Sequence, residues 1–208
     1  MVRVKICGIT NLEDALLAER LGADALGFIF TKKSPRYIRP ASAKKIIANL
    51  GPFVSKVGVF MNQKNEEVSD IASSVGLDAL QFHGKETLGY CNQFMPQFKV
   101  VKVCFPKDTV ETILRYQSLD ALMFDIPHKE KQKQKKTLPK DFMKIVKAQI
   151  KEDKKVILSG GLDSTNIKTA IKLHPYGVDV ASGIEELVGK KDKKAMKDFI
   201  ERVKNVSS

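Results

Sequence analysis

The 208-residue chain lacks the signals of several protein classes. It has no run of eighteen apolar residues to cross a bilayer, and its N-terminus lacks the charged head, apolar centre and cleavage site of a secretion signal. The cysteines Cys7, Cys91 and Cys104 form no CxxC pair, which argues against disulfides and structural zinc. No two histidines have metal-ligand spacing, so no metal is expected. These absences predict a cytoplasmic protein with reduced thiols.

Motifs of nucleotide and hydrolase chemistry are also absent. No glycine-rich dinucleotide fingerprint follows the first strand, and there is no Gly-x-Ser-x-Gly elbow or Walker loop. The formal charge of +12 fits an anionic partner, whether nucleic acid, membrane surface or phosphorylated small molecule. The lysines lie on helix faces and in a C-terminal cluster, without the interleaved aromatic residues that stack on bases. This pattern argues against nucleic-acid binding.

The chain does contain a regular alternation of apolar strands and helix-period segments, in eight units of roughly 25 residues. Strands are expected to begin near Val2, Ala25, Ser55, Ala79, Lys99, Ala121, Lys155 and Gly177, and helices near Asn11, Ala41, Asn65, Glu86, Asp108, Pro139, Ser164 and Lys191. Such alternation requires parallel strands with right-handed crossovers. Continuous apolar strands, as at residues 25–30 and 56–60, favour a closed barrel over an open doubly wound sheet. We therefore predict a compact (β/α)8 TIM barrel forming a single domain of residues 1–208.

Polar residues fall where the expected strands end, and in a barrel these ends share the face on which active sites are built. Cys7 ends the first strand and Asp125 the sixth, so they flank the barrel mouth and can divide base and acid work. A small buried hydrophobe is the alternative reading of Cys7. Arg36, after the second strand, suits either a carboxylate clamp or an ordinary solvated loop. His83, after the fourth, either binds substrate or caps the next helix.

Glycines follow the last two expected strands, in Ser159-Gly160-Gly161 and Ser182-Gly183. Their backbone N–H groups can approach an oxyanion closely, and the position after strands seven and eight is the usual barrel phosphate site. Residues 182–189 are expected to form the short extra helix of such a site. Tight turns without a ligand are the alternative.

Six blocks of sequence, which contain all of these candidate residues except Asp125, resemble the phosphoribosylanthranilate isomerase family of tryptophan and hence aromatic amino acid biosynthesis. The blocks are residues 5–10, 27–30 with 33–37, 57–60, 81–84, 159–162 and 177–185. The resemblance implies a (β/α)8 barrel and a cofactor-free isomerase. Its reaction is the Amadori rearrangement of N-(5-phosphoribosyl)anthranilate to 1-(2-carboxyphenylamino)-1-deoxyribulose 5-phosphate.

The resemblance also implies roles by position. Asp125 corresponds to the general acid that protonates the ribose ring oxygen, and Cys7 to the base that removes a proton from the neighbouring carbon. Arg36 corresponds to the residue that holds the anthranilate carboxylate, and His83 is a further substrate-binding candidate. The phosphate-binding loops are expected to include Gly160, Gly161, Asp179, Ser182 and Gly183. The expected partner is a phosphorylated small molecule, and a monomer and a homodimer are both compatible with the sequence.

One segment departs from the family pattern. Residues 126–142 carry lysines where the family has a Gly-Gly-Thr-Gly-like loop and a Lys-Thr-Phe-Asp-Trp-like helix start. A lysine-rich loop is expected to stay solvated, whereas a glycine-rich one folds closely over a ligand. The alternative function is therefore a degenerate barrel that retains the phosphate pocket but has lost or changed the isomerase activity.

Overall fold

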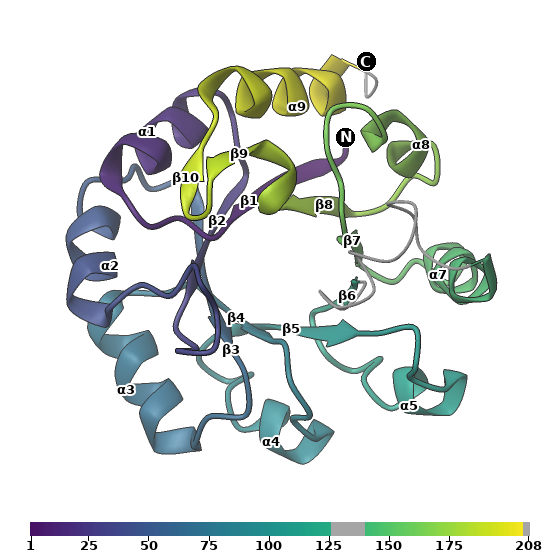
Figure 1. Cartoon of the computed structure of the whole chain (residues 1–208). Coiled ribbons are helices and arrows are strands. Elements are labelled where there is room, and N and C mark those ends of the chain that lie inside the picture. The colour runs from purple at the N-terminus through teal and green to yellow at the C-terminus, as the bar shows by residue number, and fades with distance from the viewer. Residues whose placement is uncertain (126–139, 206–208) are drawn as a thin grey trace.

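A computed structural model describes residues 1–125 and 140–205 and confirms the predicted barrel (Figure 1). The barrel strands are β1 (Arg3–Cys7), β2 (Ala25–Ile29), β3 (Ser55–Phe60), β4 (Ala79–Phe82), β5 (Lys99–Cys104), β6 (Ala121–Phe124), β7 (Val156–Leu158) and β8 (Gly177–Val180). The helices outside it are α1 (Leu12–Arg20), α2 (Pro40–Ile47), α3 (Asn65–Val75), α4 (Leu88–Asn92), α5 (Val110–Leu114), α7 (Lys140–Lys151), α8 (Ile167–Ile171) and α9 (Lys193–Asn205). None of the described helices is long and apolar enough to span a membrane.

Each barrel strand pairs in parallel with its neighbours, and β1 pairs with β8 to close the ring. The closing register places Lys5 beside Asp179, and the β1–β2 register places Cys7 beside Gly27. Strand side chains alternate between two faces, so Val4 and Ile6 pack outward in the main core while Lys5 and Cys7 face the barrel interior. The closing strand pair thus carries ionisable groups into the barrel.

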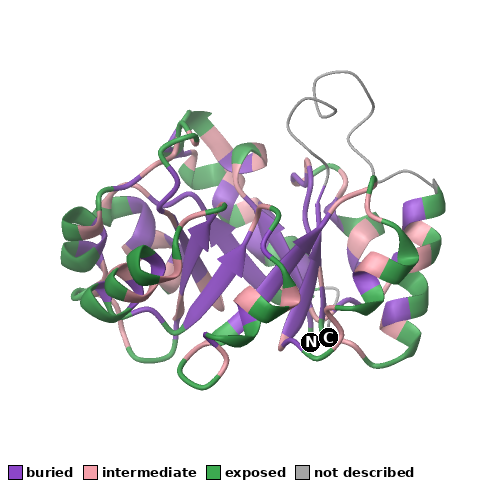
Figure 2. Cartoon of the chain, turned by 90° about the horizontal axis from the view of Figure 1, so that it is seen from below, coloured by how far each residue is buried: buried purple, intermediate pink, exposed green. Residues whose placement is uncertain are grey.

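Two apolar layers hold the fold together. The larger one lies between strands and helices and includes Phe28, Phe60, Phe82 and Phe124, and the strands are buried along their length (Figure 2). The smaller one lines the interior on the β5–β6 side, and its buried members are Val101, Val103, Ala121 and Met123. The continuous apolar strands of the sequence follow from this burial on both faces.

Local signals in the sequence set the ends of α1. The side chain of Asn11 caps this helix by accepting a hydrogen bond of 2.8 Å from the backbone N–H of Asp14. Beyond the last turn, Gly22 takes the left-handed backbone conformation at φ 88° that a residue with a side chain disfavours. The helix therefore begins at the predicted position near Asn11, and Gly22 lies just beyond its end.

The prediction of an extra helix at residues 182–189 is wrong for most of this segment. Only the short 3-10 helix η1 (Ser182–Ile184) forms, and the chain continues as an antiparallel hairpin of β9 (Glu185–Leu187) and β10 (Lys190–Lys191). The turn of the hairpin uses Gly189 at φ 82°. Charged partners on other segments hold Glu185 in the extended conformation, and these long-range contacts override the local helical pattern.

Candidate active site

Cys7 ends β1 inside the barrel mouth and lies against Lys5 and Gly27. A Cβ atom added to Gly27 would lie 2.7 Å from Cys7 Sγ and 3.0 Å from Lys5 Nζ, so both side chains occupy the space that this glycine leaves open. Lys5 Nζ forms an ion pair of 2.5 Å with Asp179 Oδ1, and Ser159 Oγ donates a hydrogen bond of 3.0 Å to Asp179 Oδ2. All five residues therefore form one polar cluster at the β1–β8 closure.

The electrostatics of this cluster act in opposite directions on Cys7. Burial raises the pKa of the thiol, the Lys5 ammonium lowers it, and the Asp179 carboxylate raises it again, with a net rise. Burial also lowers the pKa of Lys5, but Asp179 and then Cys7 raise it, and the net pKa lies above the ordinary lysine value. Lys5 is therefore an ammonium ion at neutral pH.

Asp125 directly follows β6 and is buried, next to the interior apolar layer that contains Met123. Its Oδ2 lies 3.5 Å from His83 Nε2. The other ring nitrogen of His83 is 3.3 Å from Gln81 Nε2, and the ring packs edge-on against Phe105 with centroids 5.4 Å apart. His83 thus lies beside the Asp125 carboxylate at the mouth of the barrel.

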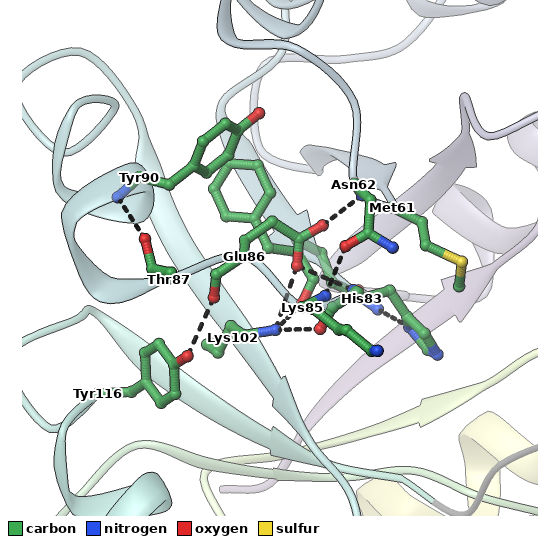
Figure 3. A network of polar contacts seen from close by, with 12 residues as sticks. Met61, Asn62, His83, Lys85, Glu86, Thr87, Tyr90, Lys102 and Tyr116 are labelled. Carbon is green, nitrogen blue, oxygen red and sulfur yellow. Dashed lines mark hydrogen bonds and ion pairs between the residues drawn. The ribbon is translucent and has the colours of Figure 1, made fainter.

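The alternative role of His83 as a helix cap belongs to Thr87 instead. Thr87 Oγ1 caps α4 by accepting a hydrogen bond of 3.2 Å from the backbone N–H of Tyr90. A buried ion pair of 3.2 Å between Lys102 on β5 and Glu86 supports the loop that begins with His83 (Figure 3). Glu86 also accepts backbone hydrogen bonds from Asn62 and Gly84, at 2.7 and 2.9 Å. This network fixes the ends of β3 and β4 relative to β5.

Arg36 lies at the mouth with one edge of its guanidinium on a buried carboxylate. Its Nε and Nη2 donate to Glu185 Oε1 and Oε2 at 2.7 and 2.6 Å, a bidentate pair. Glu185 also pairs with Lys191 at 3.1 Å, and Lys191 Nζ donates to the backbone carbonyl of Cys7 at 2.7 Å. The hairpin therefore ties Arg36 to the end of β1.

The pKa values of Glu185 and Lys191 both lie below their ordinary values, for different reasons. Burial raises the pKa of Glu185, but Arg36 and Lys191 lower it by more, so the net effect is a decrease. For Lys191, burial lowers the pKa and outweighs the opposing effects of Glu185 and Cys7, so the net effect is again a decrease. Glu185 is thus a carboxylate shared by two cations.

The two glycine loops meet at the ends of β7 and β8. Gly160 and Gly161 take positive φ values of 101° and 67°, which glycine adopts freely. Gly183 approaches the backbone of Leu162 so closely that an added Cβ would collide with its carbonyl oxygen. Ser182 begins η1 beside this contact. The two loops therefore approach each other through their backbones, and position 183 has no space for a side chain.

Asp179 lies within β8 and engages Lys5 and Ser159, rather than standing in the loop with Ser182. The lysine-rich segment on which the degenerate-barrel alternative depends lies outside the described residues. Within the described ranges, no group of three or more His, Cys, Asp or Glu side chains is arranged to hold a metal ion.

Comparison with known proteins agrees with this geometry. The family model described as N-(5'-phosphoribosyl)anthranilate (PRA) isomerase matches residues 4–202. The chain belongs to this family. The N-(5'-phosphoribosyl)anthranilate isomerase of Thermotoga petrophila is 41% identical, over 99% of this chain and 100% of the relative.

Two solved structures of the phosphoribosylanthranilate isomerase family are similar over their whole length. One is of monomers made from the dimeric enzyme of Thermotoga maritima, with TM-score 0.87, 39% identity, and 99% of this chain and 100% of that chain covered. The other is a complex with reduced 1-(o-carboxyphenylamino)-1-deoxyribulose 5-phosphate, with TM-score 0.84, 38% identity and the same coverage. The family resemblance seen in the sequence is confirmed.

Three residues of the site were missed by the sequence analysis, namely Lys5, Glu185 and Lys191. A signal for Lys5 was present, because it stands two residues before Cys7 on one strand and must share its face. No local signal pairs Glu185 with Arg36, because the two residues are far apart in the sequence.

Proposed function

We propose that this chain catalyses the Amadori rearrangement of N-(5-phosphoribosyl)anthranilate in tryptophan biosynthesis, with Asp125 as acid and Cys7 as base. The observation that carries the proposal is the match of residues 4–202 to the family, together with Cys7 and Asp125 on the ends of β1 and β6. A substrate seated over the barrel mouth would be reached by the two groups from different sides. Proton transfer alone drives such a rearrangement, so the residues themselves suffice.

The acid step opens the sugar ring. Protonated Asp125 gives its proton to the ribose ring oxygen while the bond from that oxygen to the anomeric carbon breaks. The nitrogen lone pair forms the C=N bond of a Schiff base. His83, 3.5 Å from Asp125 Oδ2, would orient the carboxyl group toward the ring oxygen.

The base step moves a proton from the adjacent carbon. The Cys7 thiolate accepts this proton, the C–H electron pair forms the C=C bond of an enolamine, and the π pair of the C=N bond returns to nitrogen. Tautomerisation of the enolamine gives the ketone product. Each well-placed acid or base contributes about 10²–10⁴-fold to such a reaction.

Arg36 and the glycine loops would hold the two anionic ends of the substrate. Glu185 occupies two of the five N–H donors of Arg36, which leaves the opposite edge of the guanidinium for the anthranilate carboxylate. The loops containing Gly160, Gly161 and Gly183 would receive the phosphate through backbone N–H groups. Asp179 is not included in this phosphate site, because Lys5 and Ser159 engage its carboxylate.

The test is turnover of phosphoribosylanthranilate, followed by the loss of its fluorescence. The unaltered protein should consume the substrate, whereas Cys7→Ala and Asp125→Asn should each be slower by about 10²–10⁴-fold. Cys91→Ala, a second buried thiol outside the mouth, is the matched control and should keep the activity. Persistent fluorescence with the unaltered protein, where a control isomerase consumes the substrate, would contradict the proposal.

We further propose a homodimer, the state that the printed description of the Thermotoga maritima relative gives for that enzyme. Phe53, in the loop before β3, is 98% exposed at the rim of a cavity of about 510 Å³ at the N-terminal end of the barrel. The cavity is lined by apolar Val101, Met123 and Ile157, and the exposed side chain of Phe53 is the apolar surface that a second copy would cover. Sedimentation should show a dimer that Phe53→Ser converts to a monomer. An unaltered protein that sediments as a monomer contradicts this.

A further inference from the structure

Lys5 is a buried charged residue that the proposed reaction steps do not use. It is 6% exposed, stands two residues before Cys7 on β1, and directs its ammonium group into the barrel interior. Burying an ammonium ion is costly unless an anion compensates it. Asp179 on β8 provides that anion at 2.5 Å.

The barrel closure fixes where this ammonium group lies. The β1–β8 register places Lys5 beside Asp179, and Ser159 Oγ, directly after β7, donates a hydrogen bond to the second carboxylate oxygen. On the other side, Lys5 Nζ shares with Cys7 Sγ the space above Gly27. Three neighbouring strands and a glycine thus place one ammonium group between a carboxylate and a thiol.

The cations around Cys7 oppose the rise in the thiol pKa that burial causes. The charged groups that interact with Cys7 are Lys5 on β1, Asp179 on β8, Lys191 on β10 and Arg36 on the loop after β2, and Glu185 on β9 pairs with both Arg36 and Lys191. With the thiol protonated, three cations face two carboxylates. The thiolate supplies the missing anion and makes the cluster neutral.

We propose that Lys5 is a positioning residue for the reaction, whose ammonium group, anchored by Asp179, stabilises the thiolate of Cys7 inside the barrel. The proposal rests on the proposed function in assigning the base role to Cys7. When the thiolate takes the substrate proton, the negative charge that Lys5 neutralises disappears from sulfur. The proton stays on Sγ while the C–H electron pair remains on the substrate. The Asp179 carboxylate partly neutralises the Lys5 ammonium charge and so limits how strongly this charge stabilises the thiolate.

Two variants should change the thiolate in opposite directions. Lys5→Met removes the stabilising charge and leaves Asp179 nearby, so the fraction of Cys7 present as thiolate should fall. Asp179→Asn removes an anion that opposes the thiolate and leaves the Lys5 ammonium in place, so that fraction should rise. A general loss of packing does not produce effects of opposite sign.

The measurement is the rate of alkylation of Cys7 by iodoacetamide as a function of pH, resolved by mass spectrometry of the Cys7 peptide. Cys7 is 5% exposed, whereas Cys91 and Cys104 are 0% and 1% exposed, and burial raises their pKa values to about 11 and about 12. At a fixed pH below the midpoint of the Cys7 alkylation profile, the alkylation rate of Cys7 should fall about tenfold in Lys5→Met and rise about tenfold in Asp179→Asn. The method needs no turnover.

Lys102→Met is the matched control, because it also removes a buried lysine paired with a carboxylate, Glu86. Lys102 lowers the pKa values of Cys91 and Cys104, and it is not among the groups that shift Cys7. The alkylation rate of Cys7 should therefore be unchanged in this variant. A change equal to that of Lys5→Met would overturn the proposal.

The signs of the two alkylation shifts decide the role of Lys5. Shifts of the same sign in Lys5→Met and Asp179→Asn, or no shift in either, overturn the role of Lys5. If Lys5→Met does not fold, a faster rate in Asp179→Asn supports the proposal and an unchanged rate overturns it. An unaltered protein that fails to turn over phosphoribosylanthranilate but shows opposite alkylation shifts contradicts the proposed function alone.

Discussion

Replacing Gly27 with alanine would insert one methyl group between Cys7 and Lys5. The added Cβ would lie 2.7 Å from Cys7 Sγ and 3.0 Å from Lys5 Nζ, with the backbone Cα of Cys7 at 3.1 Å. Ordinary contacts between such atoms are about 3.5–4.0 Å, so the sulfur must move by about 1 Å. The substitution therefore perturbs the candidate base without removing it.

The expected size of the effect follows from this displacement. Overpacking of a buried position costs about 1–3 kcal/mol of folding free energy, a loss that a barrel tolerates. A misplacement of about 1 Å at a reacting group costs about 10²-fold in rate. Gly27→Ala should thus remain folded, lose about 10²-fold in kcat for phosphoribosylanthranilate and keep its KM, because the anchors of the anionic groups do not move.

Gly58→Ala is the matched control for packing. It lies on β3, where an added Cβ would be 2.7 Å from Phe60 Cε2 and would also collide with Leu77, both in the outer layer. Urea denaturation should show a comparable stability loss for both variants, while fluorescence decay of the substrate should show unchanged kcat for Gly58→Ala. Equal kcat values for Gly27→Ala and the unaltered protein would refute the placement of Cys7 as base.

Two further changes test the substrate anchors and the pH dependence of stability. Glu185→Gln weakens the bidentate hold on Arg36 and should raise KM by roughly tenfold, measured by steady-state kinetics. Because the pKa of Glu185 is lowered in the folded state, its carboxylate stabilises the fold above the ordinary value of 4.5, and this contribution is lost as pH falls through the lowered value. Thermal unfolding of Glu185→Gln should therefore depend less on pH in that range. Gly183→Ala should raise KM, because the added Cβ collides with the Leu162 carbonyl oxygen and separates the glycine loops; an unchanged KM argues against a phosphate site there.

The architecture could be predicted because its determinants are local and repeated. Each barrel strand is a short apolar run, and signals such as the Asn11 cap and the conformation of Gly22 mark where a helix begins or ends. Positions at strand ends then share one face of a closed barrel, which brings Cys7 and Asp125 to the same mouth. Strand-end positions therefore predicted that both side chains lie at the barrel mouth, and the family resemblance supplied their proposed roles as acid and base.

The missed part of the site depends on contacts between distant segments. Glu185 was expected in a helix, but its bonds to Arg36 and Lys191 hold it in an extended strand. Asp179 was expected near the phosphate loops, yet the register of β8 against β1 turns it toward Lys5. Pattern reasoning on one sequence sees neither a register nor the partner of a charge.

The candidate acid and base are held by separate polar networks. The hairpin after β8 supports the base side, since Lys191 bonds the backbone of Cys7 and shares Glu185 with Arg36. The Lys102–Glu86 pair supports the acid side by holding the loop that begins with His83. These networks come from opposite parts of the ring, and the barrel strands connect them. A barrel can thus tune the two proton-transfer groups independently, because loop changes on one side leave the supports of the other intact.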